Sequence, residues 1–291
     1  ALRREKSARC PRTSGLPAMP AAGDEESATR PRTPGLPAEP ATRGKEPAAS
    51  PARRPALRFL RLAAGGFALG WIAYVAVIYA VQDDLVFSPS GLSESRLQRI
   101  AREYPHAEPV EIAAADGAVL RGWLLPPAAA TATSARTAGP REKAPLVLVF
   151  AGQGGEASRY FALTRMLPDL AWAFINYRGY GASDGSPSDR ALFSDAVAVY
   201  DALAARPDID AGNIFAFGGS LGTGVATYLA ARRPLAGVVL FSPYDSIGSG
   251  VARDMFRWAP AGLLIRHRFD AAAYAPAATA PVLAVVGDND A

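Results

Sequence analysis

The amino-acid sequence predicts an α/β domain whose sheet is mostly parallel and is covered by helices on both faces. Several continuous apolar runs have the length of strands, which is the pattern of parallel strands buried on both sides. Segments with helical spacing separate these runs, and a repeated strand–helix–strand order favours a parallel sheet. A third observation is the turn G-G-S-L-G at residues 218–222, which lies between an apolar run and a helical segment.

The individual elements follow the chain in order. A hairpin is predicted first, because two alternating runs flank Asp116-Gly117 in "PVEIAAADGAVLRGWLLP". An Ala/Thr-rich stretch at residues 127–144 is interpreted as a surface insertion. The expected strands are residues 145–152, 171–177, 214–217, 236–243 and 281–287. The expected helices are residues 157–166, 189–205, 222–231 and a helical stretch around residues 246–258.

The first 55 residues differ from the rest in composition. They are rich in Pro, Ala and Arg, and "PRTSGLPAMPA" is repeated twenty positions later as "PRTPGLPAEPA". Such a segment has too few large apolar residues to bury a core, so residues 1–55 are predicted to be a disordered tail. An interaction role for this tail is an alternative that its deletion would test.

An uncharged apolar run, residues 62–81, follows the tail and is long enough to cross a bilayer. We predict a transmembrane signal anchor at residues 56–82, with a cleaved signal peptide as the alternative. Because four arginines precede the run and Asp83 and Asp84 follow it, the positive-inside rule places the N-terminus in the cytoplasm. The domain at residues 83–291 would then be periplasmic or extracellular. Gly66 and Gly70 form a G-x-x-x-G pattern, which would allow a homodimer.

Composition excludes several classes of function. The net charge is +4, but the basic excess lies mainly in the first sixty residues, so we predict no nucleic-acid surface. Cys10 is the single cysteine, which excludes an internal disulfide framework and any multi-cysteine metal site. Neither G-x-x-x-x-G-K-[ST] nor G-x-G-x-x-G after a first strand is present, so both phosphate-binding motifs fail.

The turn at residues 218–222 fits G-x-S-x-G, the pattern of a nucleophile elbow between a strand and a helix. A tight turn there would project the Ser220 hydroxyl out of the sheet edge, and small residues at Gly218 and Gly222 would relieve crowding between strand and helix. The N–H of Leu221, at the start of the helix, could stabilise an oxyanion. The alternative is a glycine-rich turn with an incidental serine.

Two further loops are predicted at the same end of the sheet. "FAGQGG", starting at Phe150, follows the strongest strand and could turn backbone N–H groups toward the serine. "NYRGYGASDG", starting at Asn176, follows the next strand, and we expect its Arg178 to brace loops rather than to contact substrate.

In this order the motifs resemble the α/β-hydrolase superfamily, from about Val86 to the C-terminus. The chain is similar to its membrane-anchored, serine-aminopeptidase-like branch. The resemblance implies Ser220 as nucleophile, Asp290 as triad acid, and the backbone N–H groups of Gln153 and Leu221 as oxyanion hole, with no metal and no cofactor. It departs from the pattern at Ala151, where many relatives carry a histidine that is not the base.

The remaining assignments keep alternatives. Asp245, after the strand that ends at Pro243, is the second candidate for the acid, and Asp288 is interpreted as a loop residue. In this superfamily the nucleophilic serine is followed along the sequence by the acid and then by the histidine base. Both histidines of this sequence precede Asp290, so the base is absent from its family position. His106 is interpreted as an exposed loop residue and His267 as a poor substitute base. We therefore expect a fragment that lacks its last strand, base loop and helix, and that hydrolyses little by itself.

The function that the resemblance implies is a membrane-anchored serine hydrolase. Its substrate would be an ester, a thioester or a peptide bond in a small acyl or lipid-like molecule, with a Ser-Asp-His triad whose histidine lies past Asp290. The alternative is a non-catalytic binding or scaffold protein with the same fold.

Overall fold

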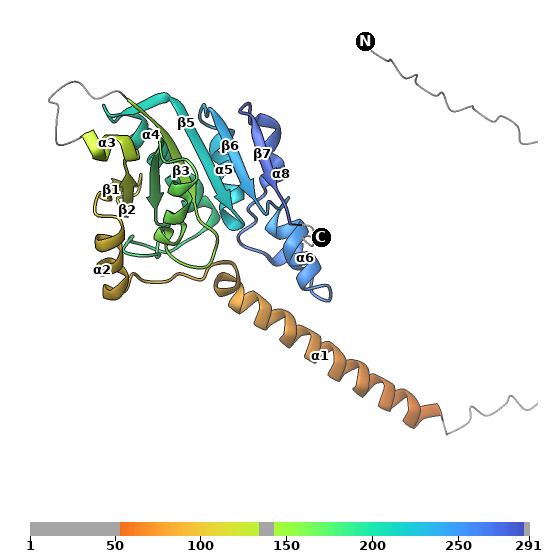
Figure 1. Cartoon of the computed structure of the whole chain (residues 1–291). Helices are drawn as coiled ribbons and strands as arrows, with labels where there is room; N and C mark the ends of the chain where they lie inside the picture. The colour runs from red at the N-terminus through yellow and green to blue at the C-terminus, as the bar shows by residue number, and fades with distance from the viewer. Residues whose placement is uncertain (1–52, 134–142, 288–291) are drawn as a thin grey trace, which may run out of the picture. The chain divides into compact units, whose positions relative to one another are not determined.

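The computed structural model describes residues 53–133 and 143–287. Within these residues, seven strands form one sheet in the order β1-β2-β4-β3-β5-β6-β7 (Figure 1). Strand β1 spans Glu108–Ala113, β2 Val119–Leu125, β3 Ala144–Phe150, β4 Ala171–Ile175, β5 Ile209–Gly219, β6 Gly237–Phe241 and β7 Val282–Val285. The pairs β1/β2 and β2/β4 are antiparallel, and every pair from β4 to β7 is parallel. The predicted fold class is confirmed.

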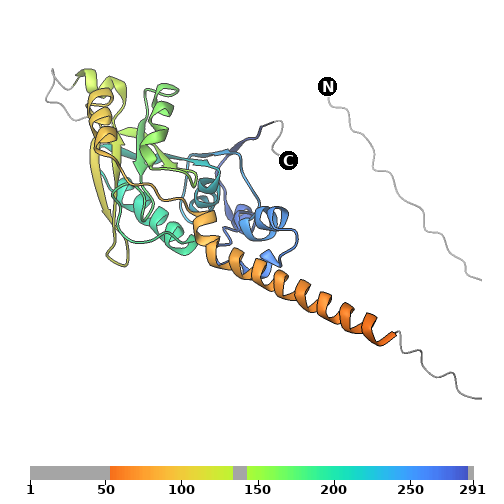
Figure 2. The same cartoon turned by 90° about the horizontal axis from the view of Figure 1, so that it is seen from below.

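Helices cover both faces of the sheet. The larger ones are α2 (Glu94–Glu103), the 3-10 helix η1 (Ala157–Arg165), α4 (Asp189–Ala204) and α5 (Leu221–Ala230). Apolar residues of α4 and α5 pack with one core cluster, whereas those of α2 and η1 pack with a second cluster. Figure 2, seen along a direction at right angles to Figure 1, shows the two helix layers on either side of the sheet.

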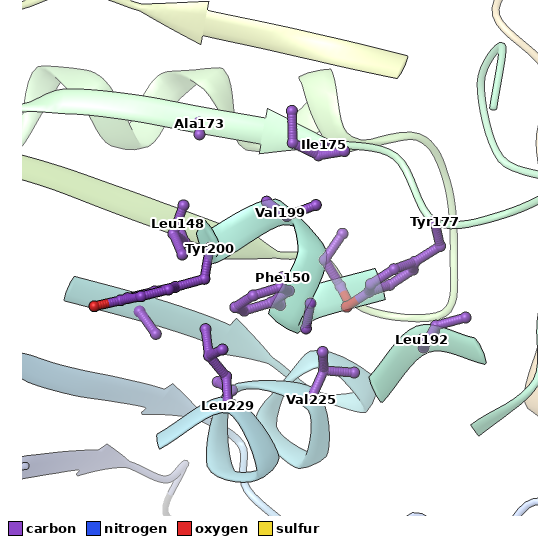
Figure 3. Packing of buried hydrophobic residues seen from close by; sticks show 14 of the residues in the cluster. Leu148, Phe150, Ala173, Ile175, Tyr177, Leu192, Val199, Tyr200, Val225 and Leu229 are labelled. Carbon is purple, nitrogen blue, oxygen red and sulfur yellow. The ribbon is translucent and has the colours of Figure 1, made fainter. Parts of the chain in front are cut away.

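Strand β3 shows how the sequence builds both layers. Leu146, Leu148 and Phe150 belong to the cluster with α4 and α5, and Val147 and Val149 belong to the cluster with η1. Successive side chains of a strand point to opposite faces, so an uninterrupted apolar run is what a doubly covered strand requires. Figure 3 shows the first cluster, in which side chains of α4 and α5 meet those of β3 and β4.

Helix α1 (Arg53–Val86) precedes the sheet domain. Within its residues Ala56–Val86 the most apolar 18-residue stretch has a mean hydropathy of 1.8, and none of that stretch is buried within the protein. By length and composition this helix could cross a membrane or act as a signal anchor. It contains the predicted anchor at residues 56–82, and the helix continues four residues beyond that boundary. The predicted tail lies outside the described residues except for its last three positions.

The chain leaves the sheet between β6 and β7 in a long connection. It contains a π-helical turn η2 (Ile247–Val251), the short helices α6 (Ala252–Met255), α7 (Ala261–Leu264) and α8 (Ala271–Tyr274), and the 3-10 turn η3 (Ala275–Ala277). We call residues 247–266 the excursion. The helical stretch predicted around residues 246–258 corresponds to η2 and α6, which follow one another without a break from Ile247 to Met255; its first turn is π-helical, and the short helix α7 begins after Pro260.

Other differences are local. Strand β5 begins at Ile209, five residues before the predicted start, and it carries an irregularity beside Ala144 and Leu146 of β3. The predicted helix at residues 157–166 has 3-10 geometry, and α3 (Ala128–Thr133) lies within the predicted insertion. The side chains of β7, the last strand of the described sheet, are all exposed.

Candidate active site

Ser220 lies in the turn between β5 and α5, at the carboxyl edge of the parallel strands. Its φ is 48° and its ψ is −115°, a conformation that costs free energy for any residue with a Cβ. The turn is fixed on both sides: Ser220 N–H donates to the Phe241 carbonyl at 2.9 Å, and the Thr223 hydroxyl donates to the Ser220 carbonyl at 2.6 Å. The residue is exposed to solvent. A strained and exposed serine in a rigid turn is the geometry of a nucleophile elbow.

The two glycines that flank this turn have no room for a side chain. A Cβ on Gly218 would overlap the backbone of Gly222 and Thr223. A Cβ on Gly222 would overlap the carbonyl oxygens of Phe150 and Ala151 in the neighbouring strand and loop. Close approach of helix α5 to β3 and β5 therefore requires glycine at both positions. This is the crowding expected from the sequence.

The loop after β3 lies directly beside the serine. A Cβ built on Gly152 would be 3.4 Å from the Gly219 carbonyl oxygen and 3.6 Å from the Cβ of Ser220. Gln153 follows in this loop, and Leu221 begins α5. Within the described residues, neither the Gln153 N–H nor the Leu221 N–H donates a hydrogen bond outside regular secondary structure. The Leu221 N–H lies at the N-terminal end of α5, where the helix dipole favours an anion, and the loop that contains Gln153 approaches the serine at Gly152.

Three tyrosine hydroxyls hold this loop, one at each of three consecutive residues. Tyr177 donates to the Ala151 carbonyl at 2.9 Å. The Gly152 N–H donates to the Tyr160 hydroxyl at 2.9 Å. Tyr180 donates to the Gln153 carbonyl at 2.8 Å. We call Tyr160, Tyr177 and Tyr180 the tyrosine clamp; it holds the peptide group between Ala151 and Gly152 and the one between Gln153 and Gly154, which lie on either side of the peptide group that carries the Gln153 N–H.

Burial keeps two members of the clamp protonated. Desolvation raises the pKa of Tyr177 well above its usual value and also raises the pKa of Tyr180. Both hydroxyls therefore remain hydrogen-bond donors to the loop carbonyls. A fourth tyrosine, Tyr244, donates to the Leu221 carbonyl at 3.1 Å, and burial raises its pKa as well. The sequence does not predict a role for these tyrosines, although Tyr177 and Tyr180 belong to the loop that is expected at this edge.

Arg178 braces loops, as predicted. Its guanidinium binds both oxygens of Asp195 on α4 at 2.7 Å and also pairs with Asp116 in the β1–β2 turn. Asp195 is buried and Arg178 nearly so. The pair ties the loop after β4 to α4 and to the hairpin, which leaves Tyr177 and Tyr180 on a rigid support.

The acid of the predicted triad, Asp290, lies outside the described residues, as does Asp288. The strand that leads to them ends beside the elbow. Phe241 of β6 pairs in register with Val285 of β7, and the Ser242 N–H donates to the Val285 carbonyl at 2.8 Å. Since Ser220 N–H binds the carbonyl of the same Phe241, the chain leaves β7 at the edge that carries the serine.

The second candidate acid, Asp245, is exposed and serves a local structural role. Its Oδ1 accepts the Ser246 N–H at 2.5 Å, and its carbonyl accepts the Ala272 N–H at 2.9 Å. These bonds hold the start of the excursion against α8. Nothing among the described contacts joins Asp245 to Ser220.

Neither histidine occupies the position of a base. His106 is exposed in the turn between α2 and β1. His267 is packed edge-on against Phe87, with Nε2 3.2 Å from an Asp83 oxygen and Nδ1 3.5 Å from an Asp189 oxygen. Both of its ring nitrogens therefore face carboxylates rather than Ser220. In the described part of the chain, no three His, Cys, Asp or Glu side chains form a group that could hold a metal ion.

Comparison with known proteins agrees with this geometry. Residues 141–267 match the family model described as serine aminopeptidase, S33. The chain is 31% identical over 218 residues to the uncharacterized protein MT2364 of Mycobacterium tuberculosis, covering 74% of this chain and 72% of that protein. It is 30% identical to the alpha/beta hydrolase domain-containing protein WAV2 of Arabidopsis thaliana, covering 64% of this chain and 60% of WAV2.

A solved structure supports the same fold. The alpha-beta hydrolase of Vibrio vulnificus superimposes with a TM-score of 0.53 at 20% sequence identity, covering 72% of this chain and 73% of that one. The sheet of this chain and the geometry of its turn at Ser220 agree with the family match obtained from the sequence. The chain belongs to the α/β-hydrolase superfamily.

Proposed function

We propose that this protein is a membrane-anchored serine hydrolase in which Ser220 is the nucleophile. The observation that carries the proposal is the strained backbone of Ser220, held at φ 48° in the turn between β5 and α5, beside the loop that contains Gly152. Folding maintains a strained conformation only where the surroundings over-determine it, and such residues are concentrated at functional sites. The membership of the hydrolase superfamily makes acyl transfer the chemistry that this geometry would serve.

In the proposed mechanism the Ser220 Oγ attacks the substrate carbonyl while its proton passes to the base. The resulting oxyanion accepts hydrogen bonds from the N–H groups of Gln153 and Leu221. Collapse of the tetrahedral intermediate expels the leaving group, which takes the proton from the base. Water then attacks the acyl-serine by the same route and releases the acid. The proposal keeps Asp290 as the acid and places the base after it, in family order.

The substrate class follows from the proposed anchor. A hydrolase held at a bilayer by α1 meets acyl chains at high local concentration, so we propose an ester of a small acyl or lipid-like molecule. The name of the matching family model keeps an N-terminal peptide bond as the second candidate. The arginines at the N-terminal end of α1 and the aspartates at its other end favour a cytoplasmic N-terminus and a catalytic domain outside.

The test is hydrolysis by protein expressed from its native gene and purified in detergent. Nitrophenyl esters of increasing chain length and aminoacyl nitroanilides would be offered in parallel. We expect ester hydrolysis that Ser220→Ala lowers by at least about 10³-fold. The matched control is Ser194→Ala, which removes an exposed hydroxyl that donates only to the Ala191 carbonyl on α4. Ester hydrolysis that persists in Ser220→Ala would refute the assignment.

A further inference from the structure

The chain that joins α1 to α2 is bonded to two loops at the carboxyl edge of the parallel strands. We call residues 87–91 of this connection the strap. Ser88 forms a parallel bridge with Gly154, which lies in the loop after β3. Gly91 forms a second parallel bridge with Gly181, which lies in the loop after β4. The strap therefore joins the two loops that lie beside the elbow and carry the tyrosine clamp.

Burial of apolar area holds only the start of the strap. Phe87 is 3% exposed and belongs to the core cluster of α4 and α5, whereas the other strap residues are exposed or half-buried. Beyond Phe87 the strap is held by backbone groups, and one of these bonds runs from the Gly181 N–H to the Ser90 carbonyl at 2.8 Å. What the strap contributes to the protein after Phe87 is thus mainly its bonds to the two loops.

One hydrogen-bonded chain runs from the strap to the candidate oxyanion loop. The Ser88 N–H donates to the Tyr180 hydroxyl at 3.0 Å, and the same hydroxyl donates to the Gln153 carbonyl at 2.8 Å. A tyrosine hydroxyl has a single proton, so an N–H on its oxygen leaves that proton for the carbonyl. Hydrogen bonds in such a chain strengthen one another, most of all where water is excluded, and Tyr180 is 1% exposed. The strap and the loop are therefore joined through one buried hydroxyl.

These contacts act on the peptide group next to the candidate oxyanion donor. Tyr180 holds the Gln153 carbonyl, and the bridge of Ser88 lies at Gly154, so both act where Gln153 is joined to Gly154. The Gln153 N–H belongs to the preceding peptide group. The two groups share the Cα of Gln153, so a rotation of one changes the direction in which the other points. Misplacement of a catalytic group by a fraction of its bond length to substrate is enough to slow a reaction.

We propose that the strap positions the oxyanion loop, and that Ser88 is a positioning residue which acts through its backbone N–H on Tyr180. The segment by which the chain leaves α1 is then part of the proposed active site. Loss of the chain as far as residue 91 would remove a support of the oxyanion loop together with α1. The effect on hydrolysis rests on the proposed function, whereas the effect on the order of the loop does not depend on Ser220.

The test substitutes one position twice, in full-length protein expressed from its native gene. Ser88→Pro removes the N–H that Tyr180 accepts, whereas the matched control Ser88→Ala keeps it and removes only an exposed side chain. Hydrogen exchange followed by mass spectrometry reports on peptides that cover residues 150–161. We expect exchange there to be about fivefold faster in Ser88→Pro and unchanged in Ser88→Ala. For ester hydrolysis, kcat should fall about fivefold in Ser88→Pro with little change in KM.

Tyr180→Phe supplies a second arm that does not require the strap to tolerate proline. It breaks the same link from the other side, so it should speed the exchange of the Ser88 N–H, measured in peptides that cover residues 86–92. Because both substitutions act on one link, Ser88→Pro should lower kcat by less than about twofold further when Tyr180→Phe is already present. Separate structural damage by proline would instead add its full effect to that of Tyr180→Phe.

The outcomes separate the strap from the nucleophile. The inference is overturned if exchange over residues 150–161 is the same in Ser88→Pro and Ser88→Ala, if the Ser88 N–H exchanges no faster in Tyr180→Phe, or if the two effects on kcat are additive. Faster exchange with unchanged kcat, in a protein that loses hydrolysis in Ser220→Ala, also overturns the positioning role. Hydrolysis that survives Ser220→Ala refutes the proposed function instead, and the two exchange measurements then decide whether the strap supports the loop.

Discussion

The elbow and the excursion leave the same edge of the sheet, yet they are specified in opposite ways. At the elbow, backbone groups are in contact on every side: Gly218 and Gly222 have no space for a Cβ, and Ser220 is held at a positive φ. In the excursion, short turns carry exposed apolar side chains, and its attachments are mainly to α1. The elbow therefore depends on an exact backbone conformation, whereas the excursion leaves several large apolar side chains exposed.

This contrast predicts how the two regions respond to substitution. A methyl group added at the elbow must disturb the fold, because the atoms it meets are backbone carbonyls that cannot move aside. Side chains of the excursion can change with little effect on stability, because they bury little area within the protein.

The largest effect is expected from Gly222→Ala. Its methyl group would overlap two carbonyl oxygens, of Phe150 and Ala151, so the free energy of unfolding should fall by about 3 kcal/mol or more. Thermal unfolding in detergent, followed by circular dichroism, measures this change. The control is Gly91→Ala, where a Cβ would meet no atom within 4 Å and stability should be unchanged. Equal stability of the two variants would show that the elbow is less constrained than described.

A smaller effect is expected when the tyrosine clamp loses one hydroxyl. Tyr180→Phe frees the Gln153 carbonyl, so the adjacent N–H donors should be held less firmly and kcat should fall about tenfold with little change in KM. Tyr200→Phe is the matched control, because it also removes a 2.8 Å hydroxyl–carbonyl bond, to Pro234, on the other side of α4. If both variants lose stability alike and neither loses kcat, the clamp has only a structural role.

The strain at Ser220 should be measurable as stability. Glycine adopts a positive φ without the cost that serine bears, so Ser220→Gly should raise the free energy of unfolding by about 1 kcal/mol relative to Ser220→Ala. Urea unfolding of the two variants gives the difference directly. An alanine variant as stable as the glycine variant would remove the argument that the fold maintains strain at this position.

The smallest effect concerns the attachment of the chain after the excursion. Burial raises the pKa of Asp189, but hydrogen bonds from His267 and from the N–H groups of Arg190 and Arg268 outweigh it and leave that pKa below its usual value. The charged form is therefore favoured by folding, and its contribution is present above pH of about 4 and is lost as the pH falls through the lowered pKa. Asp189→Asn should lower the urea midpoint at neutral pH.

The difference between wild type and Asp189→Asn should shrink as the pH is taken below about 4, where the wild-type carboxyl is also neutral. Asp169→Asn serves as control, since Asp169 is exposed and forms no ion pair among the described residues. A difference that is the same at both ends of the pH range would mean that charge at Asp189 plays no part.

Much of the fold could be predicted because its signals are local. Each of these signals is only a few residues long: the apolar runs of β3 and β4, the hairpin turn at Asp116-Gly117, and the G-x-S-x-G elbow. Helix α2 and the early start of β5 were missed, because both are polar at the surface and depend on their neighbours.

The candidate site was only partly predictable. Ser220 and the crowding at its flanking glycines follow from the motif, but the tyrosine clamp does not. Tyr177 and Tyr180 contact residues 26 and 27 positions away, and no periodicity in the sequence signals such contacts. The predicted acid, Asp290, stays a prediction because it lies outside the described residues.

Covalent labelling would show whether Ser220 is an activated nucleophile. Protein from the native gene would be incubated with a fluorophosphonate, digested, and analysed by mass spectrometry to locate the phosphonylated residue. The account predicts one adduct, on the peptide that contains Ser220, and none in Ser220→Ala. Labelling of a different serine, or equal labelling of the wild type and Ser220→Ala, would contradict it.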